Sequence, residues 1–315
     1  MKNQSNIEKT KAMLKPKFTL LFLFLISLGF SQEIEIKKLE INTKLDHFAA
    51  RVVNDKVFFS SNLVTKRGRA ITDDFSQELF GVYSGIVDNN GEIKDIELIK
   101  KTEYGQFNMS VTTHSEDGKY MYFTGNHNRK GEDKLKDKKV NKLLIKRAEY
   151  IEDKGWTNFE DLPFCDPAFN YAHPALSPDG STLYFIADVE GTKGKSDLYK
   201  VSVSDHKSYG EVTKLSDSIN SSRTELYPFV STDNKLYFSS DRRGGKGSLD
   251  VYSYDLKNDN PEQIAVSLDE PINSIGDDFS FFLNDDLSTG YLSSRRLRGE
   301  GRDDLYYFSG FKSND

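Results

Sequence analysis

The sequence predicts an all-β protein, a single β-propeller of about five four-stranded blades, with six blades as the alternative if one repeat is degenerate. Two internal similarities carry this prediction. Leu183-Tyr184-Phe185 recurs 53 residues later as Leu236-Tyr237-Phe238, and Asp197-Leu198-Tyr199 recurs at the same distance as Asp250-Val251-Tyr252. A fixed period of roughly 50 residues filled with short strands is typical of propellers and related arrays. No segment has the sustained helical periodicity that would favour another fold class.

The first two repeats have turn signals where a four-stranded blade needs them. Asn54-Asp55 and Asn89-Asn90-Gly91 separate β-rich runs in the first repeat, and Asn-Gly is a strong hairpin signal. The second repeat turns at Glu116-Asp117-Gly118, and its lysine-rich insertion over 125–142 is expected to be a solvated loop. The strands expected here cover 47–53, 56–60, 77–86, 94–99, 106–112, 120–124 and 143–150, and the segment with Trp156 completes the second blade.

The third, fourth and fifth repeats are clearer. Ser177-Pro178-Asp179-Gly180 is a turn with a mechanism, because Pro presets φ, Asp caps the turn and Gly accepts a positive φ. The segment entering the fourth repeat, 215–221, matches the segment entering the fifth, 268–274. Expected strands begin near His173 and then cover 182–187, 226–231, 235–239 and 250–254, and the fifth repeat runs from 277 to about 309.

The fifth repeat lacks an obvious fourth strand after Tyr306-Tyr307-Phe308. The segment 33–41 alternates partly at period two and belongs to no complete repeat. A propeller must join its first and last blades. We therefore predict that this N-terminal strand completes the fifth blade.

Residues 1–31 have the layout of a secretory signal peptide, since lysines precede an apolar run of 13 residues, Phe18 to Phe30. The propeller domain is then predicted over 32–315, without a transmembrane segment in the mature chain. Residues 1–31 contain five lysines and one glutamate, so the mature chain keeps 38 basic and 48 acidic side chains. Nucleic acid is therefore not an expected partner. Cys165 is the single cysteine, which excludes an intrachain disulfide, and we expect a monomer.

A basic loop follows the second strand of every repeat, and Arg242-Arg243 recurs 53 residues later as Arg295-Arg296. Equivalent loops emerge on one face of a propeller, so we expect a basic face that selects an acidic partner. The alternative is a structural role. In that case the arginines, above all Arg242 and Arg295, would form salt bridges with Asp241, Asp250 or Asp304 that tie each loop to the third strand. The predicted binding residues are Arg67, Arg69, Arg129, Lys195, Arg242, Arg243, Lys246, Arg295, Arg296 and Arg298.

No catalytic residues, cofactor or metal ligands are predicted. The chain has no Gly-x-Ser-x-Gly elbow. Its five histidines lack the spacing of a metal site, and Cys165 is expected to be an unreactive thiol. Acidic pairs such as Asp277-Asp278 do not form the spaced loop that binds calcium.

The blade pattern of Ser177-Pro178-Asp179-Gly180, then Leu-Tyr-Phe, then the Ser-Ser-Asp-Arg-Arg-Gly-Gly loop resembles the WD40-like repeat of TolB-type propellers. More narrowly, Ile272-Asn273-Ser274 followed by Asp277-Asp278-Phe279 is similar to propeller segments found upstream of OmpA-like domains in Bacteroidetes-type envelope proteins. This resemblance implies a periplasmic or outer-membrane-associated protein, and for some members a role in type IX secretion and gliding. No peptidoglycan-binding domain follows the last repeat, so cell-wall anchoring is not expected.

The sequence thus favours a non-catalytic propeller that is periplasmic, associated with the cell envelope or outer membrane, or secreted. We expect it to act as a protein-interaction scaffold and an accessory of outer-membrane or secretion machinery. The expected partner is an envelope or outer-membrane protein with an acidic surface, or an anionic glycan. The alternative is a glycan-binding propeller or a sialidase-like glycoside hydrolase acting on surface polysaccharide. An acidic cluster and an aromatic platform in the central channel would favour that alternative.

Overall fold

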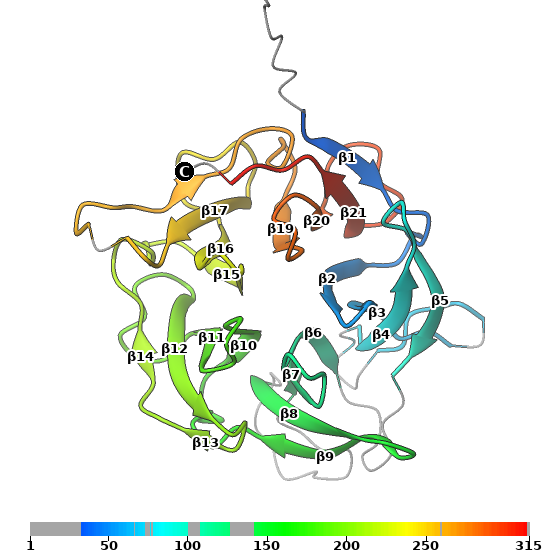
Figure 1. The fold of residues 1–315 in the computed structure, drawn as a ribbon, viewed down its shortest axis with the longest axis horizontal. Helices are drawn as coiled ribbons and strands as arrows, with labels where there is room; N and C mark the ends of the chain where they lie inside the picture. Colours follow the sequence, from blue (N-terminus) through cyan, green and yellow to red (C-terminus); the bar gives the residue numbers. More distant parts are fainter. Residues whose placement is uncertain are drawn as a thin grey trace, which may run out of the picture. The chain divides into compact units, whose positions relative to one another are not determined.

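The computed structural model describes residues 33–65, 67–72, 76, 78–99, 108–126, 142–258 and 260–313. Five antiparallel sheets radiate from a central axis, and Figure 1 looks along that axis. The fold is therefore a five-bladed propeller, and the six-bladed alternative is excluded. No helix occurs among the described residues, so none there is long and apolar enough to cross a membrane. The predicted signal peptide at 1–31 lies outside the described residues.

The strands of each blade are given in order from the innermost strand, next to the central axis, to the outermost. Blades 1 and 2 consist of β2 (His47–Val53), β3 (Lys56–Asn62), β4 (Phe80–Val87), β5 (Ile93–Leu98), β6 (Met109–His114), β7 (Tyr120–Asn126), β8 (Leu143–Ile151) and β9 (Gly155–Asp161). Blade 3 consists of β10 (Tyr171–Leu176), β11 (Thr182–Ala187), β12 (Asp197–Ser204), β13 (Ser208–Tyr209) and β14 (Thr213–Lys214). The predicted strand over 77–86 begins only at Phe80, because the preceding chain forms the second-to-third-strand loop.

Blade 4 consists of β15 (Glu225–Val230), β16 (Lys235–Ser240), β17 (Asp250–Asp255) and β18 (Val266–Ser267). Blade 5 consists of β19 (Asp278–Leu283), β20 (Gly290–Ser294), β21 (Asp304–Ser309) and, as its outermost strand, β1 (Glu35–Lys38). The register pairs Glu35 with Ser309 and Lys38 with Tyr306. The predicted closure by the N-terminal strand is thus confirmed, although the strand is shorter than 33–41. In Figure 1 β1 and β21 lie side by side in this blade, and the chain after β21 runs on toward β17 of blade 4.

The blades are held together by five apolar clusters, one between each pair of neighbours around the ring. Phe58 of blade 1 meets Met109 of blade 2, for example, and Phe59 of blade 1 meets Tyr291 of blade 5. Each sheet is therefore covered on both faces by aromatic and aliphatic side chains. Burial of this apolar area is the main favourable term in the free energy of folding.

A buried asparagine links the end of one blade to the start of the next in three places. Asn42, Asn220 and Asn273 each accept the backbone N–H of the second residue of a third strand, at 2.8, 2.7 and 2.8 Å. Each also donates through Nδ2 to the carbonyl oxygen of that same residue, at 2.8, 3.0 and 2.9 Å. The matching entry segments 215–221 and 268–274 are explained by this contact. Ile41-Asn42 is a third copy that the repeat comparison missed.

Every innermost strand has a bulge at its third residue. Ala49, Val111, His173, Tyr227 and Ser280 all have φ between 44° and 58°, and the strand register shifts at each. A positive φ is uncommon outside glycine. Its recurrence in all five blades indicates that the ring geometry imposes it, since a bulge bends the strand and increases its twist.

In blades 1 to 4 the freed N–H of the bulge residue bonds to the preceding blade. The hydroxyls of Ser60 and Thr124 accept from Val111 and His173, each at 2.9 Å. Blade 3 has Ile186 at the corresponding position, which cannot accept a hydrogen bond. There the N–H of Tyr227 donates to His173 Nδ1 at 3.2 Å, and the two rings stack 3.9 Å apart. His173 therefore has a structural role between blades 3 and 4.

Replacing a linking asparagine should destabilise the ring. Asn273→Ala leaves the buried N–H and C=O of Val251 without their side-chain partner, so we expect the free energy of unfolding to fall by about 2–3 kcal/mol. Urea titration followed by tryptophan fluorescence measures this change. Asn258→Ala, an exposed asparagine, is the control and should change the free energy by less than about 0.5 kcal/mol. Equal effects of the two substitutions would contradict the role assigned to Asn273.

Candidate functional site

The predicted basic loops join the second strand to the third in each blade, so they emerge at one end of the ring, which we call the basic end. The opposite end has the turns between first and second strands. Of the predicted binding residues, nine lie among the described residues, and Arg129 lies outside them. The nine fall into two groups that the sequence did not separate: side chains bound within the protein and side chains open to solvent.

Arg242 is bound within blade 4. Its guanidinium forms an ion pair with the buried Glu225 at 2.8 Å and also donates to the carbonyl of Ile219. Its Cζ lies 5.0 and 4.9 Å from the ring centres of Phe238 and Tyr252. This arrangement anchors the loop to the innermost strand β15.

Arg296 repeats this arrangement in blade 5. It pairs with the buried Asp278 at 2.7 Å, donates to Ile272 O at 2.8 Å and lies 4.9 Å from the ring of Tyr306. The equivalent of Arg242 is therefore Arg296 and not Arg295. The predicted bridge also has a different target, since both ion pairs are formed with a carboxylate of the first strand and not with the aspartates at or beside the third.

In blades 3, 4 and 5 the third strand begins with an aspartate, and its carboxylate accepts hydrogen bonds from backbone N–H groups of the preceding loop. Asp250 accepts from the N–H of Gly247, Asp304 from Glu300 and Gly301, and Asp197 from Lys193 and Gly194. A Cβ at Gly245 would lie 1.9 Å from Asp250 Oδ2, so only glycine allows the loop to close on this carboxylate. The glycine-rich composition of these loops thus has a structural cause.

Five basic side chains on these loops are exposed and form no ion pair within the described part of the chain. They are Arg67, Arg69, Lys195, Arg243 and Arg298. Two others are exposed but paired: Lys246 with Glu270 at 2.9 Å, and Arg295 with Asp277 and Asp303 at 3.3 and 2.5 Å. This unpaired group is the solvent-exposed part of the predicted basic face.

Two large apolar side chains accompany these cations at the basic end. Ile275 is 72% exposed and Leu297 is 76% exposed. They lie on neighbouring segments, since the Cα of Gly276 abuts the backbone of Arg295 and Arg296 so closely that a Cβ there would be 2.8 Å from the Arg295 carbonyl oxygen. Exposed apolar groups beside basic ones are a feature of interaction sites. No sequence signal separated them from core residues.

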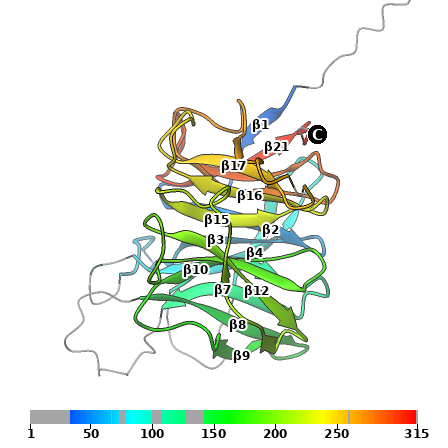
Figure 2. The same cartoon turned by 90° about the vertical axis from the view of Figure 1, so that its left-hand side faces the viewer.

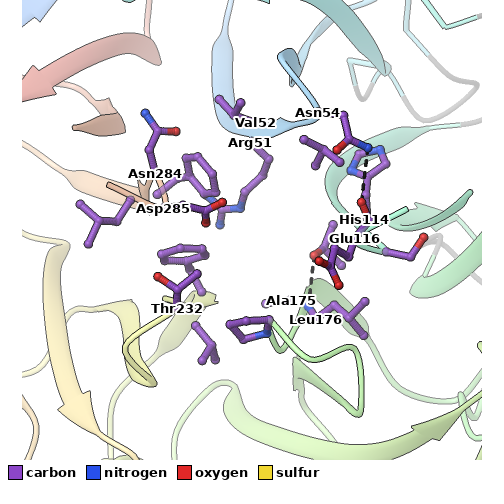
Figure 3. A pocket seen from close by; sticks show the side chains of 18 of the residues that line it. Arg51, Val52, Asn54, His114, Glu116, Ala175, Leu176, Thr232, Asn284 and Asp285 are labelled. Carbon is purple, nitrogen blue, oxygen red and sulfur yellow. Dashed lines mark hydrogen bonds between the residues drawn. The ribbon is translucent and has the colours of Figure 1, made fainter. Parts of the chain in front are cut away.

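The innermost strands enclose a central cavity of about 740 Å³ that opens toward the end opposite to the basic end. Residues of all five blades line it, and Figure 3 shows Arg51 extending from β2 into the space between them. Its mouth has three exposed carboxylates on turns, those of Asp55, Glu116 and Asp285. From the sequence we expected binding at the mouth of the central channel, but none of the residues that line it was predicted. The available signal was Arg51 itself, a charged residue inside the otherwise apolar run of β2.

Three histidines of the innermost strands lie among packed side chains, and loss of hydration lowers their pKa. The pKa falls to about 4 for His47 and to about 3 for His114 and His173. For His173 the positive charge of Arg51 lowers it further. His114 lines the cavity and lies against Phe58, with 4.1 Å between ring centres. All three are therefore neutral at physiological pH.

Among the described residues, no group of three histidine, cysteine or carboxylate side chains is arranged to hold a metal ion. Burial raises the pKa of the Cys165 thiol to about 12, which makes its thiolate scarce at neutral pH. These observations leave the two ends of the ring as the candidate sites: the basic end with its exposed apolar pair, and the central cavity.

The chain matches no protein-family model and no curated protein. Among solved structures it is similar to a putative TolB from Agrobacterium tumefaciens, with a TM-score of 0.51 and 13% identity over 88% of this chain and 90% of that one. The chain has the fold of a TolB-type propeller. RS223 β-xylosidase is similar at a TM-score of 0.50 and 15% identity, over 89% and 96%. TolB from Acinetobacter baumannii has a TM-score of 0.44 and 16% identity over 84% of this chain, which spans 55% of that protein's length.

These likenesses concern the fold, because identities this low carry no activity across. The predicted resemblance to TolB-type propellers is confirmed at that level. The narrower resemblance to OmpA-associated envelope proteins stays a prediction.

The two groups of loop arginines should respond differently to truncation. Arg242→Ala leaves Glu225 buried without its partner, so we expect a loss of about 3 kcal/mol in the free energy of unfolding. Arg243→Ala, its exposed neighbour, is the matched control and should cost less than about 0.5 kcal/mol. Denaturant titration compares them. A similar loss in both variants would refute the division into bound and free arginines.

The buried histidines should make the protein less stable in mild acid. Their folded-state pKa values lie below the value of 6.5 in the unfolded chain, so the unfolded state binds more protons once the pH falls below about 6.5. The contribution of the neutral histidines to the free energy of unfolding is complete above this pH. Near pH 5, where unfolding takes up about three protons, the free energy of unfolding decreases by about 4 kcal/mol per pH unit. His114→Phe should reduce that slope by about one third, measured by urea titration at several pH values. An unchanged slope would show that His114 is not buried as a neutral ring.

Proposed function

We propose that this protein is a non-catalytic binding propeller of the cell envelope that captures an acidic partner protein at its basic end. The expected secretory signal at 1–31 motivates the location. The partner would be an envelope or outer-membrane protein, and the role that of an accessory scaffold.

The observation that carries this proposal is the combination of unpaired cations with an exposed apolar pair at one end of the ring. Arg243 and Arg298 lie on the loops of blades 4 and 5, and Leu297 lies next to Arg298 in the chain. Clustered positive charge raises the rate of association with an acidic surface. Desolvated apolar side chains at the centre of such a patch provide most of the binding energy. The acidic excess of the chain as a whole makes this local positive patch more selective.

Anchoring makes the loops suitable for binding. Arg242 and Arg296 tie them to the innermost strands, while the aspartates tie their backbones to the third strands. A loop that is ordered before binding loses less conformational entropy when the partner arrives. The paired arginines therefore support the surface that the exposed arginines present.

A glycan-binding or glycoside hydrolase function is the second candidate, and the β-xylosidase among the similar structures keeps it open. The carboxylates that line the central cavity, Asp55, Glu116 and Asp285, are exposed on turns. A glycosidase acid usually works from a buried position that raises its pKa. The cavity is therefore better suited to binding than to acid catalysis.

The test is crosslinking capture from envelope fractions with the purified protein. Arg243→Glu combined with Arg298→Glu should lower the affinity for the captured partner by about tenfold or more, and raised salt should weaken capture by the unmodified protein. Leu297→Ala should weaken capture without changing its salt dependence. Arg296 is left unchanged because its loss would disturb the fold.

Lys56→Glu combined with Lys257→Glu is the matched control, since it makes the same charge change at exposed positions near the opposite end. We expect it to leave capture unchanged. Equal losses of capture in both double variants, or unchanged capture after charge reversal at the basic end, would contradict the proposal.

A further inference from the structure

Arg51 is a buried cation without a carboxylate partner. Its side chain comes from the fifth residue of β2 and is 4% exposed. Nη1 donates to the carbonyl oxygens of Ala50 and Phe281, both at 3.3 Å, while Nη2 has no hydrogen-bond partner. Within the described part of the chain, no ion pair compensates its charge. A charge in this position is costly unless something pairs with it.

The surroundings of Arg51 are those of a binding pocket. The guanidinium Cζ lies 5.2 Å from the ring centre of Phe229 and 5.4 Å from that of Phe282, so two apolar rings flank it. Both rings also line the central cavity, whose volume of about 740 Å³ is typical of small-molecule sites. His114 lines the same cavity, and neither of its ring nitrogens has a hydrogen-bond partner. Figure 3 shows Arg51 extending into the cavity, and His114 lies at its wall beside Asn54.

The mouth of the cavity has the opposite charge. The carboxylates of Asp55, Glu116 and Asp285 are exposed on the turns of three blades. They disfavour entry of a compound with two or more negative charges, such as a phosphate ester, and attract a positive group. A ligand with one carboxylate at its inner end and an ammonium group at its outer end matches both charges.

We propose that the central cavity binds a small apolar carboxylate of the amino-acid or short-peptide type, with its carboxylate on Arg51 and its apolar side chains against Phe229 and Phe282. The guanidinium geometry suits a carboxylate, which accepts two parallel N–H donors. The ammonium group of the ligand then faces the acidic mouth. This site lies at the end of the ring away from the basic loops and is independent of the partner proposed there.

Isothermal titration calorimetry with three related probes tests this assignment. The dipeptide leucyl-phenylalanine should bind, and its N-acetyl derivative should bind more weakly because it loses the contact with the acidic mouth. The C-terminal amide should bind about 100-fold more weakly or not at all, because it lacks the carboxylate. Absence of binding by the free dipeptide, or equal binding by the amide, would overturn the proposal.

Variants locate the site. Arg51→Met should reduce dipeptide affinity by about 100-fold while its unfolding temperature without ligand stays the same or rises, because a buried unpaired charge is removed. A lowered unfolding temperature together with unchanged affinity would assign Arg51 a structural role instead. Thr232→Trp, at the exposed mouth, should block binding without touching Arg51. Arg243→Ala, at the basic end, should bind the dipeptide like the unmodified protein, and a loss there would contradict the location.

Discussion

Pairing of β1 with β21 is the contact on which the rest of this structure depends. The sheets of a propeller are covered on both faces only if the ring is complete, because each apolar cluster needs two neighbouring blades. Blade 5 obtains its outer strand from the opposite end of the chain, and Asn42 then locks the following segment to Leu305. The chain ends are thereby joined without a covalent bond. In Figure 2 the described elements form stacked sheets seen from the side, with β1 and β21 next to each other.

The same structural problem is solved in four blades with slightly different residues. The bulge of the innermost strand releases a backbone N–H, and in blades 1, 2 and 3 a serine or threonine hydroxyl of the preceding blade accepts it. At the joint of blades 3 and 4 the ring of His173 takes this role. His173 is therefore a neutral hydrogen-bond acceptor between two strands. This substitution shows how far the repeat can vary while its hydrogen bonds are kept.

The two ends of the ring offer different kinds of site. At the basic end, exposed cations lie on the same loops as exposed apolar side chains, and the ion pairs of Arg242 and Arg296 with buried carboxylates anchor two of those loops. At the other end, carboxylates surround a cavity whose deepest charged group is Arg51. Charge on an exposed surface is screened by salt, whereas charge in a cavity acts at close range in a low dielectric. The first arrangement suits a protein surface, and the second suits a small ligand.

The repeat period, the turns and the loop compositions of this chain are local properties, and they were sufficient to predict the blades, the closing strand and the position of the basic loops. The 53-residue spacing of Leu183 and Leu236 needs no knowledge of contacts, since a repeated sequence must adopt a repeated local structure. The contacts of the individual side chains depend on the assembled ring. A loop arginine is bound within the protein only if a carboxylate lies within about 3 Å of it. Glu225 and Asp278 come within this distance of Arg242 and Arg296 only after the strands are paired. Arg51 became a candidate for the same reason: only five assembled blades enclose the cavity in which its charge has no partner.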